Sequence, residues 1–425
     1  MNTARVLDAS WLTSGPAARV LRLLNSGGEE ARAVGGAVRN ALLDIAVTEI
    51  DIATTAVPDE VVRRAKAAGI KSVPTGIEHG TVTLVVDGQP FEVTTLREDT
   101  ETFGRKAKVS FGRDWVGDAR RRDFTINALS AGLDAVVHDY VGGLDDIAAR
   151  RVRFIGEPGR RLEEDYLRIL RFFRIHAAFG AGDVDRAGYL ACIQARAGLA
   201  TLSAERVRME MLKLLVADGA VYAASAMADG GLLQMIVGGI TYPGTFAAMV
   251  AAEKTLGLKA DAMRRLAALA VALPEDARRL ATRLRLSNNE AKALDSMGHR
   301  WWRLAGMDEA RARRRLYRLG EQRYRDRLML AWARAGTASD PAAWIDLARL
   351  PQRFTPPKFP LRAADFIARG VAEGPALGRV LTLAEDAWLA ADFPLEPHLL
   401  ALIADQAVAR LARDQKPARD QNCQE

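Results

Sequence analysis

The sequence predicts an α+β protein, with a mixed sheet and its helices at the N-terminal end and an all-α extension after them. Two observations predict this division. Short β-branched runs alternate with helical patterns only in about the first 155 of the 425 residues. From Arg160 onward the apolar residues recur with helical spacing, and Ala, Leu, Arg and Glu dominate. We therefore expect a sheet-containing head followed by helices.

The strands and helices of the head are expected from local composition. Runs of β-branched and aromatic residues predict strands, and a Gly-Gly pair and a proline predict the starts of two helices. The expected strands are residues 33–34, 50–54, 81–86, 91–95 and 136–139, and the expected helices follow Gly36 and span 58–68.

Glycine and proline mark the boundaries of the helical extension. Gly156, Pro158 and Gly159 separate it from the head, and the four prolines of residues 351–360 do not belong in a helix interior. We therefore expect four parts: a head of residues 1–155, a helical neck of 156–220, a helical body of 221–350 and a helical tail of 351–425.

Composition excludes several classes of protein. Two cysteines exclude a disulfide framework and a thiolate-rich zinc cluster, and the five histidines form no HExxH pair. The apolar run 266–273 is far shorter than the ~18 residues of a membrane span. Residues 1–30 contain acids and no apolar leader. We expect a soluble cytoplasmic protein without membrane contact, and the sequence leaves its oligomeric state open.

Positive charge is concentrated in one segment. The net charge of the chain is +7, but residues 259–334 hold 19 Lys and Arg against 9 Asp and Glu, a local net charge of +10. A basic segment of this kind suits an RNA backbone, and a set of solvated helix faces explains the charge equally well. Five aromatic residues are interleaved with these cations, namely Trp301, Trp302, Tyr317, Tyr324 and Trp332.

A Gly-Gly pair lies where an apolar strand meets a helix. Gly35 and Gly36 let the backbone approach a ligand, and the helix start offers free N–H groups to a phosphate. Arg39, one turn further, can add a guanidinium to the same anion. Such a pair is also common as plain architecture. No GxxxxGK[ST] occurs, which excludes a P-loop NTPase.

Two carboxylates follow in a predicted strand. Glu49 and Asp51 flank Ile50, so both acids are expected on one face of that strand. Two such carboxylates can hold Mg²⁺ through oxygen ligands, and paired metal ions clamp the attacking and leaving oxygens in phosphoryl transfer. The alternative is a surface strand with polar residues outward, which the Gly-Gly turn disfavours. Glu92, a further strand acid, can face the same place.

Residues 34–43 (VGGAVRNALL) and 49–61 (EIDIATTAVPDEV) resemble the first motif of the class II nucleotidyltransferases, the family of CCA-adding tRNA nucleotidyltransferases and bacterial poly(A) polymerases. The family pattern is GG-x-VRD followed by D-x-D. The resemblance implies a nucleotidyltransferase palm of strands and two helices that carries the acids and two Mg²⁺ ions. Two residues depart from the pattern: Asn40 replaces Asp, and Glu49 replaces the first metal-binding Asp, moving its carboxylate by ~1.5 Å.

Residues 121–128 (RRDFTINA) resemble the family's RRDFTxNA motif. Asp123 or Thr125 is expected to cap the following helix, which would leave Arg122 directed at a triphosphate or a ribose. Residues 138–146 resemble the family's D-x-x-G-G-x-x-D motif. We interpret that segment as a turn or hinge between the palm and the helices.

Residues 164–174 (EDYLRILRFFR) resemble the family's EDxxRxxRxxR helix. Asp165, Arg168, Arg171 and Arg174 recur every three residues and form a polar ridge, which a row of exposed salt bridges also explains. A carboxylate only accepts and a guanidinium only donates, so Asp165 and Arg168 favour C and A over U and G. The resemblance implies that this pair is the template for CTP and ATP. Arg171 and Arg174 would then hold phosphates or orient Asp165.

Two further segments resemble the family. Residues 202–210 resemble its last motif, and we expect Ser203 to cap a helix that packs against the template helix. Residues 374–381 and Trp388 resemble its tail segment more loosely.

Together the motifs predict an enzyme that adds CMP, CMP and AMP to the 3′ end of tRNA, using CTP and ATP. The acids would hold Mg²⁺, the Gly-Gly turn with Arg39 and Arg122 would hold the triphosphate, and the basic body and tail would grip the acceptor and T arms. The alternatives are a poly(A) polymerase, an enzyme that adds only CC or only A, and a weakly active RNA-binding platform. Residues 97–116 are expected to form a mobile loop that governs the switch from C to A.

Overall fold

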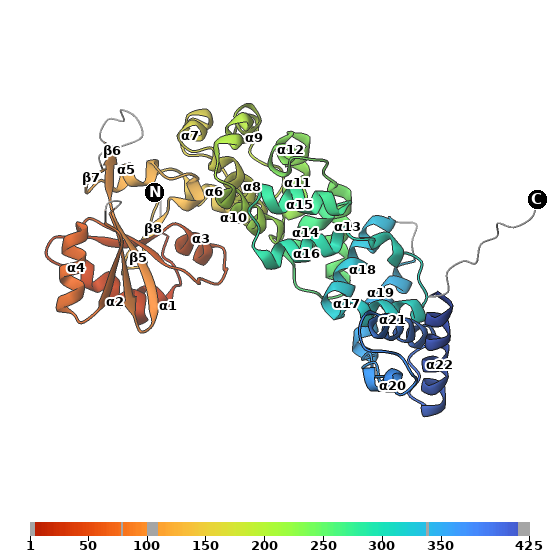
Figure 1. The fold of residues 1–425 in the computed structure, drawn as a ribbon. Helices are drawn as coiled ribbons and strands as arrows, with labels where there is room; N and C mark the ends of the chain where they lie inside the picture. The colour runs from red at the N-terminus through yellow and green to blue at the C-terminus, as the bar shows by residue number, and fades with distance from the viewer. Residues whose placement is uncertain (1–4, 78–79, 100–108, 337–339, 415–425) are drawn as a thin grey trace, which may run out of the picture. The chain divides into compact units, whose positions relative to one another are not determined.

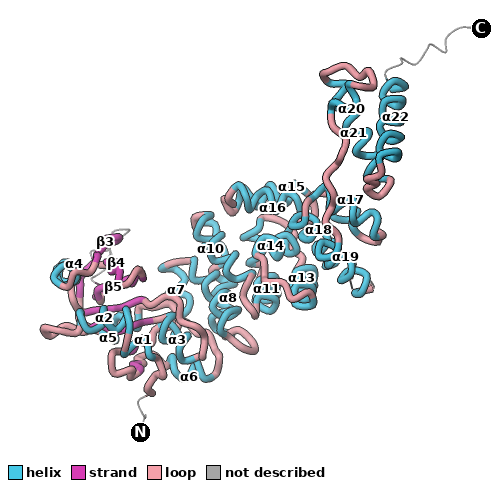
Figure 2. The backbone as a smooth tube through the Cα atoms, turned by 90° about the horizontal axis from the view of Figure 1, so that it is seen from below, coloured by secondary structure: helices cyan, strands magenta, loops and turns pink. Residues whose placement is uncertain are grey.

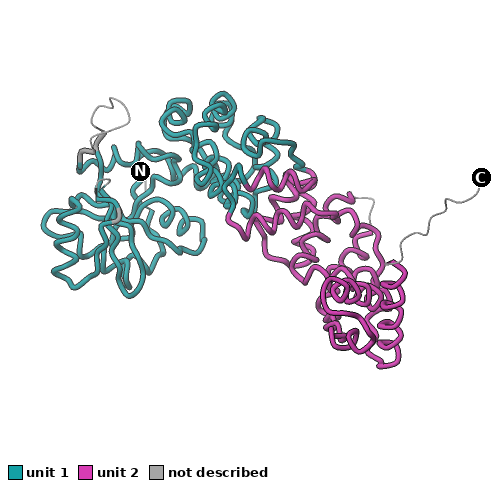
Figure 3. The backbone as a smooth tube through the Cα atoms, in the orientation of Figure 1, with its two compact units in different colours: residues 1–243, 282–286 teal, residues 244–281, 287–425 magenta. Residues whose placement is uncertain are grey.

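The computed structural model describes residues 5–77, 80–99, 109–336 and 340–414. The chain divides into two compact units (Figure 3): unit 1 comprises residues 1–243 and 282–286, and unit 2 comprises residues 244–281 and 287–425. Unit 1 thus contains the whole of the predicted head and neck. The finer division into head, neck, body and tail stays a prediction.

Unit 1 begins with a seven-stranded mixed sheet (Figure 1). Its strand order is β3-β4-β5-β2-β1-β8-β9, in which β2 and β5 are parallel and the other neighbours are antiparallel. A separate two-stranded ladder joins β6 (Arg97–Asp99) to β7 (Val109–Phe111). The strands of the large sheet are β1 Ala31–Val34, β2 Asp51–Thr54, β3 Lys71–Gly76, β4 Thr81–Val86, β5 Gln89–Thr95, β8 Ser130–Ala131 and β9 Val137–His138.

Helices cover one face of this sheet. α2 (Gly15–Leu24), which follows α1 (Ser10–Thr13), packs against β1 and β4, and α4 (Pro58–Ala67) packs against β3 and β4. Alternate residues of β4, namely Val82, Leu84 and Val86, are buried, as the two-residue period of a strand requires. On β5 the same alternation buries Phe91 and Val93 and leaves Glu92 exposed. The face away from the helices is therefore free to carry acids.

The rest of unit 1 is helical and is joined to the sheet by an aromatic cluster. α8 packs against α7, α10 and α11. Phe124, Phe154 and Phe172 stack with ring centroids 4.9 to 6.2 Å apart. The elements are α3 Gly36–Leu42, α5 Trp115–Arg120, η2 Thr125–Asn127, α6 Gly143–Ala148, α7 Pro158–Glu164, α8 Leu167–Phe179, α9 Arg186–Gln194, η3 Arg196–Thr201, α10 Ala204–Leu215, α11 Ala220–Asp229 and α12 Leu232–Val237.

Unit 2 contains helices and loops, and its described residues include no strand (Figure 2). One hydrophobic cluster joins α17, α18 and α19, and another joins α20, α21 and α22. The α+β fold class predicted from the sequence is confirmed. The helices after α12 are α13 Pro243–Thr255, α14 Ala262–Ala270, α15 Pro274–Arg283, α16 Asn288–Gly298, η4 Trp301–Leu304, α17 Glu309–Leu319, α18 Glu321–Ala335, α19 Pro341–Arg353, α20 Ala363–Ile367, α21 Pro375–Ala390 and α22 Pro397–Asp414.

The aromatic residues interleaved with the basic segment are mostly packing residues. Tyr324 is fully buried, and Trp301 and Trp332 pack against the same hydrophobic cluster. Tyr317 packs in the α20–α22 cluster, and Trp302 is the one of the five that is largely exposed, at 47%. The spacing of aromatics among cations therefore reflects the helix cores and lends no support to base stacking.

Three local expectations change. β2 starts at Asp51, so Glu49 and Ile50 precede the strand. Pro351 lies inside the last turn of α19, where the helix is already ending. The predicted loop of residues 97–116 is a β6–β7 ladder at its ends, and its middle, residues 100–108, lies outside the described residues. None of the described helices is both long and apolar enough to cross a membrane.

Candidate active site

One cavity of unit 1, with a volume of about 560 Å³, brings together all of the predicted site residues. It is also lined by Asp123, Asn127 and Arg206, which were not predicted as site residues. Asp123 and Asn127 belong to the RRDFTxNA-like segment, and Arg206 belongs to the last motif, so the motifs themselves held the signal. The ten predicted residues are Gly35, Gly36, Arg39, Glu49, Asp51, Arg122, Asp165, Arg168, Arg171 and Arg174.

The Gly-Gly turn forms one wall of the cavity. Gly35 has φ +66°, a left-handed backbone that favours glycine, and its N–H donates to the Leu129 carbonyl at 3.0 Å. A Cβ on Gly35 would lie 3.3 Å from Nη1 of Arg122, so a side chain here would press on the neighbouring guanidinium. α3 has only seven residues, so the contribution of this turn is close backbone approach rather than a long helix dipole.

Arg39 is held from three sides. Its guanidinium lies 3.6 Å from the centroid of the Phe179 ring and donates to Oδ1 of Asn127 at 2.5 Å and to Oδ1 of Asn40 at 2.8 Å. Burial, followed by the charge of Arg174, lowers the pKa of Arg39 to about 10. Both side-chain hydrogen-bond partners are neutral amides, so Arg39 brings uncompensated positive charge to the cavity wall.

The carboxylates lie together on the open face of the sheet. The parallel register pairs Ile52 of β2 with Val93 of β5, which brings Asp51 beside Glu92. Partial burial, then the negative charge of Glu92, raises the pKa of Asp51, and Glu49 adds to this effect against the opposing charge of Arg122. Carboxylates that repel one another in this way favour a bound cation.

The two carboxylates suit a divalent metal ion that a substrate also ligates, rather than one held by protein ligands alone. Within the described ranges no group of three or more His, Cys, Asp or Glu side chains is placed to hold a metal ion. Mg²⁺ is ordinarily bound through one or two carboxylates together with waters and the phosphates of a substrate. Glu49 and Asp51 line the same cavity as the arginines, so a triphosphate bound there would complete such a ligand set.

Asp123 is a buried charge that organises the cavity. It is 9% exposed and accepts from Nε of Arg171 at 2.8 Å, from Nδ2 of Asn127 at 3.2 Å and from the Phe124 backbone N–H at 2.8 Å. Burial acts to raise the pKa of Asp123, but the ion pair with Arg171 and the hydrogen bonds outweigh it, so the pKa is lowered. The expectation that Asp123 or Thr125 caps a helix is wrong, because the N-cap residue of η2 is Phe124 and no side chain caps this helix.

Arg122 points along the cavity from the end of α5. Its Nη2 donates to Asp118 at 3.1 Å, and Asp118 is itself buried and also bound by Arg121. The carboxylate therefore fixes the direction of Arg122 and leaves part of its donor fork free.

The predicted template helix is broken at Asp165. α7 ends at Glu164, α8 begins at Leu167, and Asp165 has an extended backbone with φ −157°. Its Oδ1 accepts the Leu167 N–H at 3.0 Å, and its Oδ2 accepts Nη2 of Arg206 at 2.6 Å. The prediction of one continuous polar ridge is therefore wrong: Asp165 lies at a helix junction, and Arg206 of α10 orients it.

The three arginines of α8 have separate partners. Nη1 of Arg168 donates to the Arg161 carbonyl at 2.6 Å and pairs with Glu164. Arg171 bridges to Asp123, and Arg174 pairs with Glu210. Within the described structure neither Arg171 nor Arg174 forms a hydrogen bond or ion pair with Asp165, so their expected roles, holding phosphates or orienting Asp165, stay predictions.

The packing of the last motif agrees with the prediction. Ser203 caps α10 by accepting the Arg206 N–H, and α10 packs directly on α8. Through Glu210 and Arg206 this helix contributes one buried acid and one pocket cation, so it does more than pack.

Two segments of the chain match known families. Residues 31–153 match the family described as "Poly A polymerase head domain", and residues 188–242 match the one described as "Probable RNA and SrmB- binding site of polymerase A". The matched parts include the Gly-Gly turn and the acids, whereas the α7–α8 junction lies between them.

Similar proteins extend this likeness along the chain. "CCA tRNA nucleotidyltransferase 1, mitochondrial" of Danio rerio is 41% identical over 208 residues, which are 48% of each chain. The human protein of the same name is 42% identical over 192 residues, 44% of each chain, so the match spans about half the length of these relatives. The "CCA-adding enzyme" of Limosilactobacillus fermentum is 32% identical over 376 residues, covering 86% of this chain and 90% of the relative.

Solved structures show the same fold. The Bacillus stearothermophilus CCA-adding enzyme, solved in complex with CTP, superposes with a TM-score of 0.71 at 25% identity, covering 93% of this chain and 98% of that chain. The Thermotoga maritima CCA-adding enzyme gives a TM-score of 0.70 at 20% identity over 97% of this chain and 100% of that chain. The long match to the Limosilactobacillus protein, together with these folds, shows that the chain belongs to the family of CCA-adding enzymes.

Proposed function

We propose that this chain is a CCA-adding tRNA nucleotidyltransferase, which adds CMP, CMP and AMP to the 3′ end of tRNA from CTP and ATP and releases pyrophosphate. One observation carries the proposal: a single cavity holds a pair of carboxylates, a Gly-Gly turn, several guanidinium groups and the Asp165–Arg168 pair. Together these groups meet the needs of phosphoryl transfer and of base selection without a nucleic-acid template.

Glu49 and Asp51 would hold Mg²⁺ in this proposal. When bound, the metal supplies positive charge that lowers the pKa of the attacking 3′-hydroxyl and balances the charge of the triphosphate. The two acids keep the reacting oxygen in reach of the α-phosphate, where a new O–P bond forms as the bond to pyrophosphate breaks. The longer side chain of Glu49 is accommodated because Glu49 precedes β2 and is exposed, outside the strand ladder.

The triphosphate would lie against the Gly-Gly turn and two guanidinium groups. Gly35 permits close backbone approach, Arg122 is positioned by Asp118, and Arg39 brings charge that no acid among the described residues pairs with at hydrogen-bond distance. Arg171 and Arg174 add positive charge to the same cavity while Asp123 and Glu210 fix their positions.

Asp165 and Arg168 would select the base. In C and A the edge that faces the protein has an amine beside a ring nitrogen, which matches an acceptor next to a donor. In U and G that edge carries a carbonyl, which cannot donate to the Asp165 carboxylate and places two acceptors against each other. A site built to hydrogen-bond one edge can reject a base that lacks the matching donor by 10⁴-fold or more.

The partner in this proposal is tRNA, held at its acceptor and T arms by the basic segment 259–334 and the tail. Contacts of guanidinium groups with phosphates would recognise the shape of the RNA rather than its sequence. The cytoplasmic location stays a prediction.

The test is an incorporation assay with the purified chain, Mg²⁺ and a tRNA that ends before its CCA, offered each nucleoside triphosphate singly and mixed. We expect two C and then one A. Extension of arbitrary RNA with A alone would indicate a poly(A) polymerase, addition that stops at CC or requires it would indicate a partial enzyme, and binding without incorporation would indicate an RNA-binding platform.

Asp51→Ala provides the site control for this assay. Loss of a metal-binding carboxylate should remove on the order of 10³-fold of activity, because several kcal/mol of charge stabilisation disappear from the transition state. Asp87→Ala, which removes an exposed acid from the turn between β4 and β5, should leave incorporation unchanged. Equal activity of Asp51→Ala and wild type would refute the assignment of the metal site.

A further inference from the structure

A stripe of arginines lies along one face of α17 in unit 2. Arg311, Arg314, Arg315 and Arg318 follow the i, i+3, i+4, i+7 spacing that places side chains on one side of a helix. The other side of α17 carries Ala312 and Leu316, which are buried in the α17–α19 hydrophobic cluster. The core therefore fixes the direction in which the arginine stripe points.

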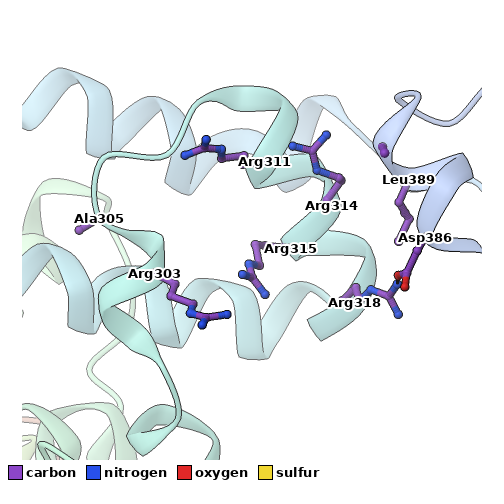
Figure 4. A pocket seen from close by; sticks show the side chains of 9 residues that line it. Arg303, Ala305, Arg311, Arg314, Arg315, Arg318, Asp386 and Leu389 are labelled. Carbon is purple, nitrogen blue, oxygen red and sulfur yellow. Dashed lines mark hydrogen bonds and ion pairs between the residues drawn. The ribbon is translucent and has the colours of Figure 1, made fainter. Parts of the chain in front are cut away.

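This stripe forms the wall of a cavity of about 700 Å³ (Figure 4). η4 adds Arg303 to the lining, and α21 adds Asp386 and Leu389. In Figure 4, Arg303 and Arg315 extend into the space between η4 and α17, while Arg318 is turned toward Asp386. We call the five guanidinium groups of residues 303, 311, 314, 315 and 318 the arginine pocket.

Acids balance only part of this charge. Arg318 pairs with Asp386 and with Glu385, and Arg311 lies 3.8 Å from Asp308. The other three, Arg303, Arg314 and Arg315, form no side-chain hydrogen bond or ion pair with any residue of the described chain. The arginine pocket therefore holds excess positive charge in a partly enclosed space.

The excess positive charge disfavours the protonated form of Arg315. Burial lowers its pKa, and the neighbouring cations Arg303, Arg300, Arg318 and Arg314 lower it further. A protonated guanidinium among like charges is stabilised by any anion that enters the cavity.

We propose that the arginine pocket binds phosphates of the tRNA backbone. The inference rests on the proposed function, and it assigns to one defined cavity part of the RNA grip that the basic segment as a whole could only suggest. The four arginines of α17 span ~10 Å along the helix axis, enough to face several phosphates of a duplex. The described lining contains no aromatic side chain to stack on a base, which favours a backbone over a free nucleotide.

The test compares two doubly substituted full-length proteins that lose the same charge. Arg314→Gln/Arg315→Gln removes two unbalanced cations of the pocket. Arg63→Gln/Lys66→Gln removes two exposed cations of α4 in unit 1, outside the basic segment 259–334. The Kd for a tRNA lacking CCA is measured by fluorescence anisotropy from 50 to 300 mM salt, and thermal melting verifies that each variant is folded.

We expect the pocket variant to raise the Kd on the order of tenfold and to reduce the slope of log K against log[salt] by about 1 for each cation removed. The α4 variant should change both the Kd and the salt slope much less. Arg314→Lys/Arg315→Lys keeps the charge and should retain most of the slope. Arg303→Gln, at an exposed position, repeats the measurement if the double variant does not fold.

Three results would overturn the inference: an unchanged Kd and slope in the pocket variants, equal losses in both double variants, or loss of inorganic tripolyphosphate binding while tRNA binding persists. The last would assign the pocket to a free polyphosphate. Failure of the proposed function looks different, because a wild type that binds tRNA through the pocket and incorporates nothing rejects the activity alone.

Discussion

The two arginine-rich cavities differ in how their charge is balanced. In the cavity of unit 1 nearly every guanidinium pairs with a carboxylate, whereas in the arginine pocket of unit 2 three of the five have no acid partner in the described structure. Pairing fixes each guanidinium in one direction, which suits a ligand whose base must be distinguished from others. Unpaired cations attract any phosphate, which suits a backbone that is the same at every nucleotide.

The largest effect is expected when Asp123, the buried acid of the unit 1 cavity, is replaced. Asp123→Asn should destabilise the protein at pH 7 by about 2 kcal/mol, because the half-buried Arg171 would lose its nearest carboxylate and keep only Glu210 at 3.8 Å. Urea unfolding measures the change.

The pH dependence has a defined sign. The pKa of Asp123 is lowered in the folded protein, so the carboxylate stabilises the fold above its usual value of 3.8 and loses this effect as the pH falls below it. The difference in the free energy of unfolding between wild type and Asp123→Asn should therefore become smaller below about pH 4. Asp386→Asn, an exposed acid of the arginine pocket, should change stability by less than about 1 kcal/mol, and equal effects at the two sites would contradict the comparison.

A smaller effect is expected where one arginine orients the base-reading acid. Arg206→Gln should leave Asp165 less firmly held, which would reduce the preference for C over U in kcat/KM by about 10²-fold with little change in stability. Single-nucleotide incorporation with each triphosphate measures the preference. Arg208→Gln on the same helix is the matched control, because Arg208 donates to the Arg285 carbonyl and does not line the cavity. Unchanged base preference in Arg206→Gln would show that Asp165 needs no such support.

The smallest effect is expected at Arg39, whose side-chain hydrogen-bond partners in the unit 1 cavity are amides rather than carboxylates. Asn40→Asp would give Arg39 an acidic partner in place of an amide, so it should stabilise the protein by about 1 kcal/mol and raise the melting temperature by a few degrees. Asn40→Ala should lower it, because Arg39 would lose a hydrogen-bond acceptor. The opposite order of the two variants would indicate that Arg39 is already balanced by its surroundings.

The sequence predicted the elements of the head well, because β-branched runs, the Gly-Gly turn and Pro58 act locally. It also predicted ten site residues that the fold brings together in one cavity. It could not reveal which acid pairs with which arginine, since the partners Asp123 and Arg171 are 48 residues apart. β3 was missed because Pro74 and Gly76 lower its strand signal.

The helix break at Asp165 shows a second limit. A three-residue spacing of charges predicts a continuous helix, but a short acidic side chain can instead accept a backbone N–H and start a new one. In this chain Asp165 starts a new helix in this way, and the helical spacing of residues on either side does not reveal the break.

The position of Asp165 also has an evolutionary consequence. The same carboxylate that is proposed to read the base accepts the N–H of Leu167, the first residue of α8, and loss of such a hydrogen bond costs about 1 kcal/mol. A mutation of Asp165 that removes its acceptor oxygens would therefore both relax nucleotide choice and weaken the start of the helix that carries Arg168, Arg171 and Arg174. Natural or laboratory variants that acquire a new nucleotide preference through such a mutation should therefore carry a compensating substitution nearby. A Ser, Thr or Asn that supplies a new acceptor to the first N–H groups of α8 is the expected kind.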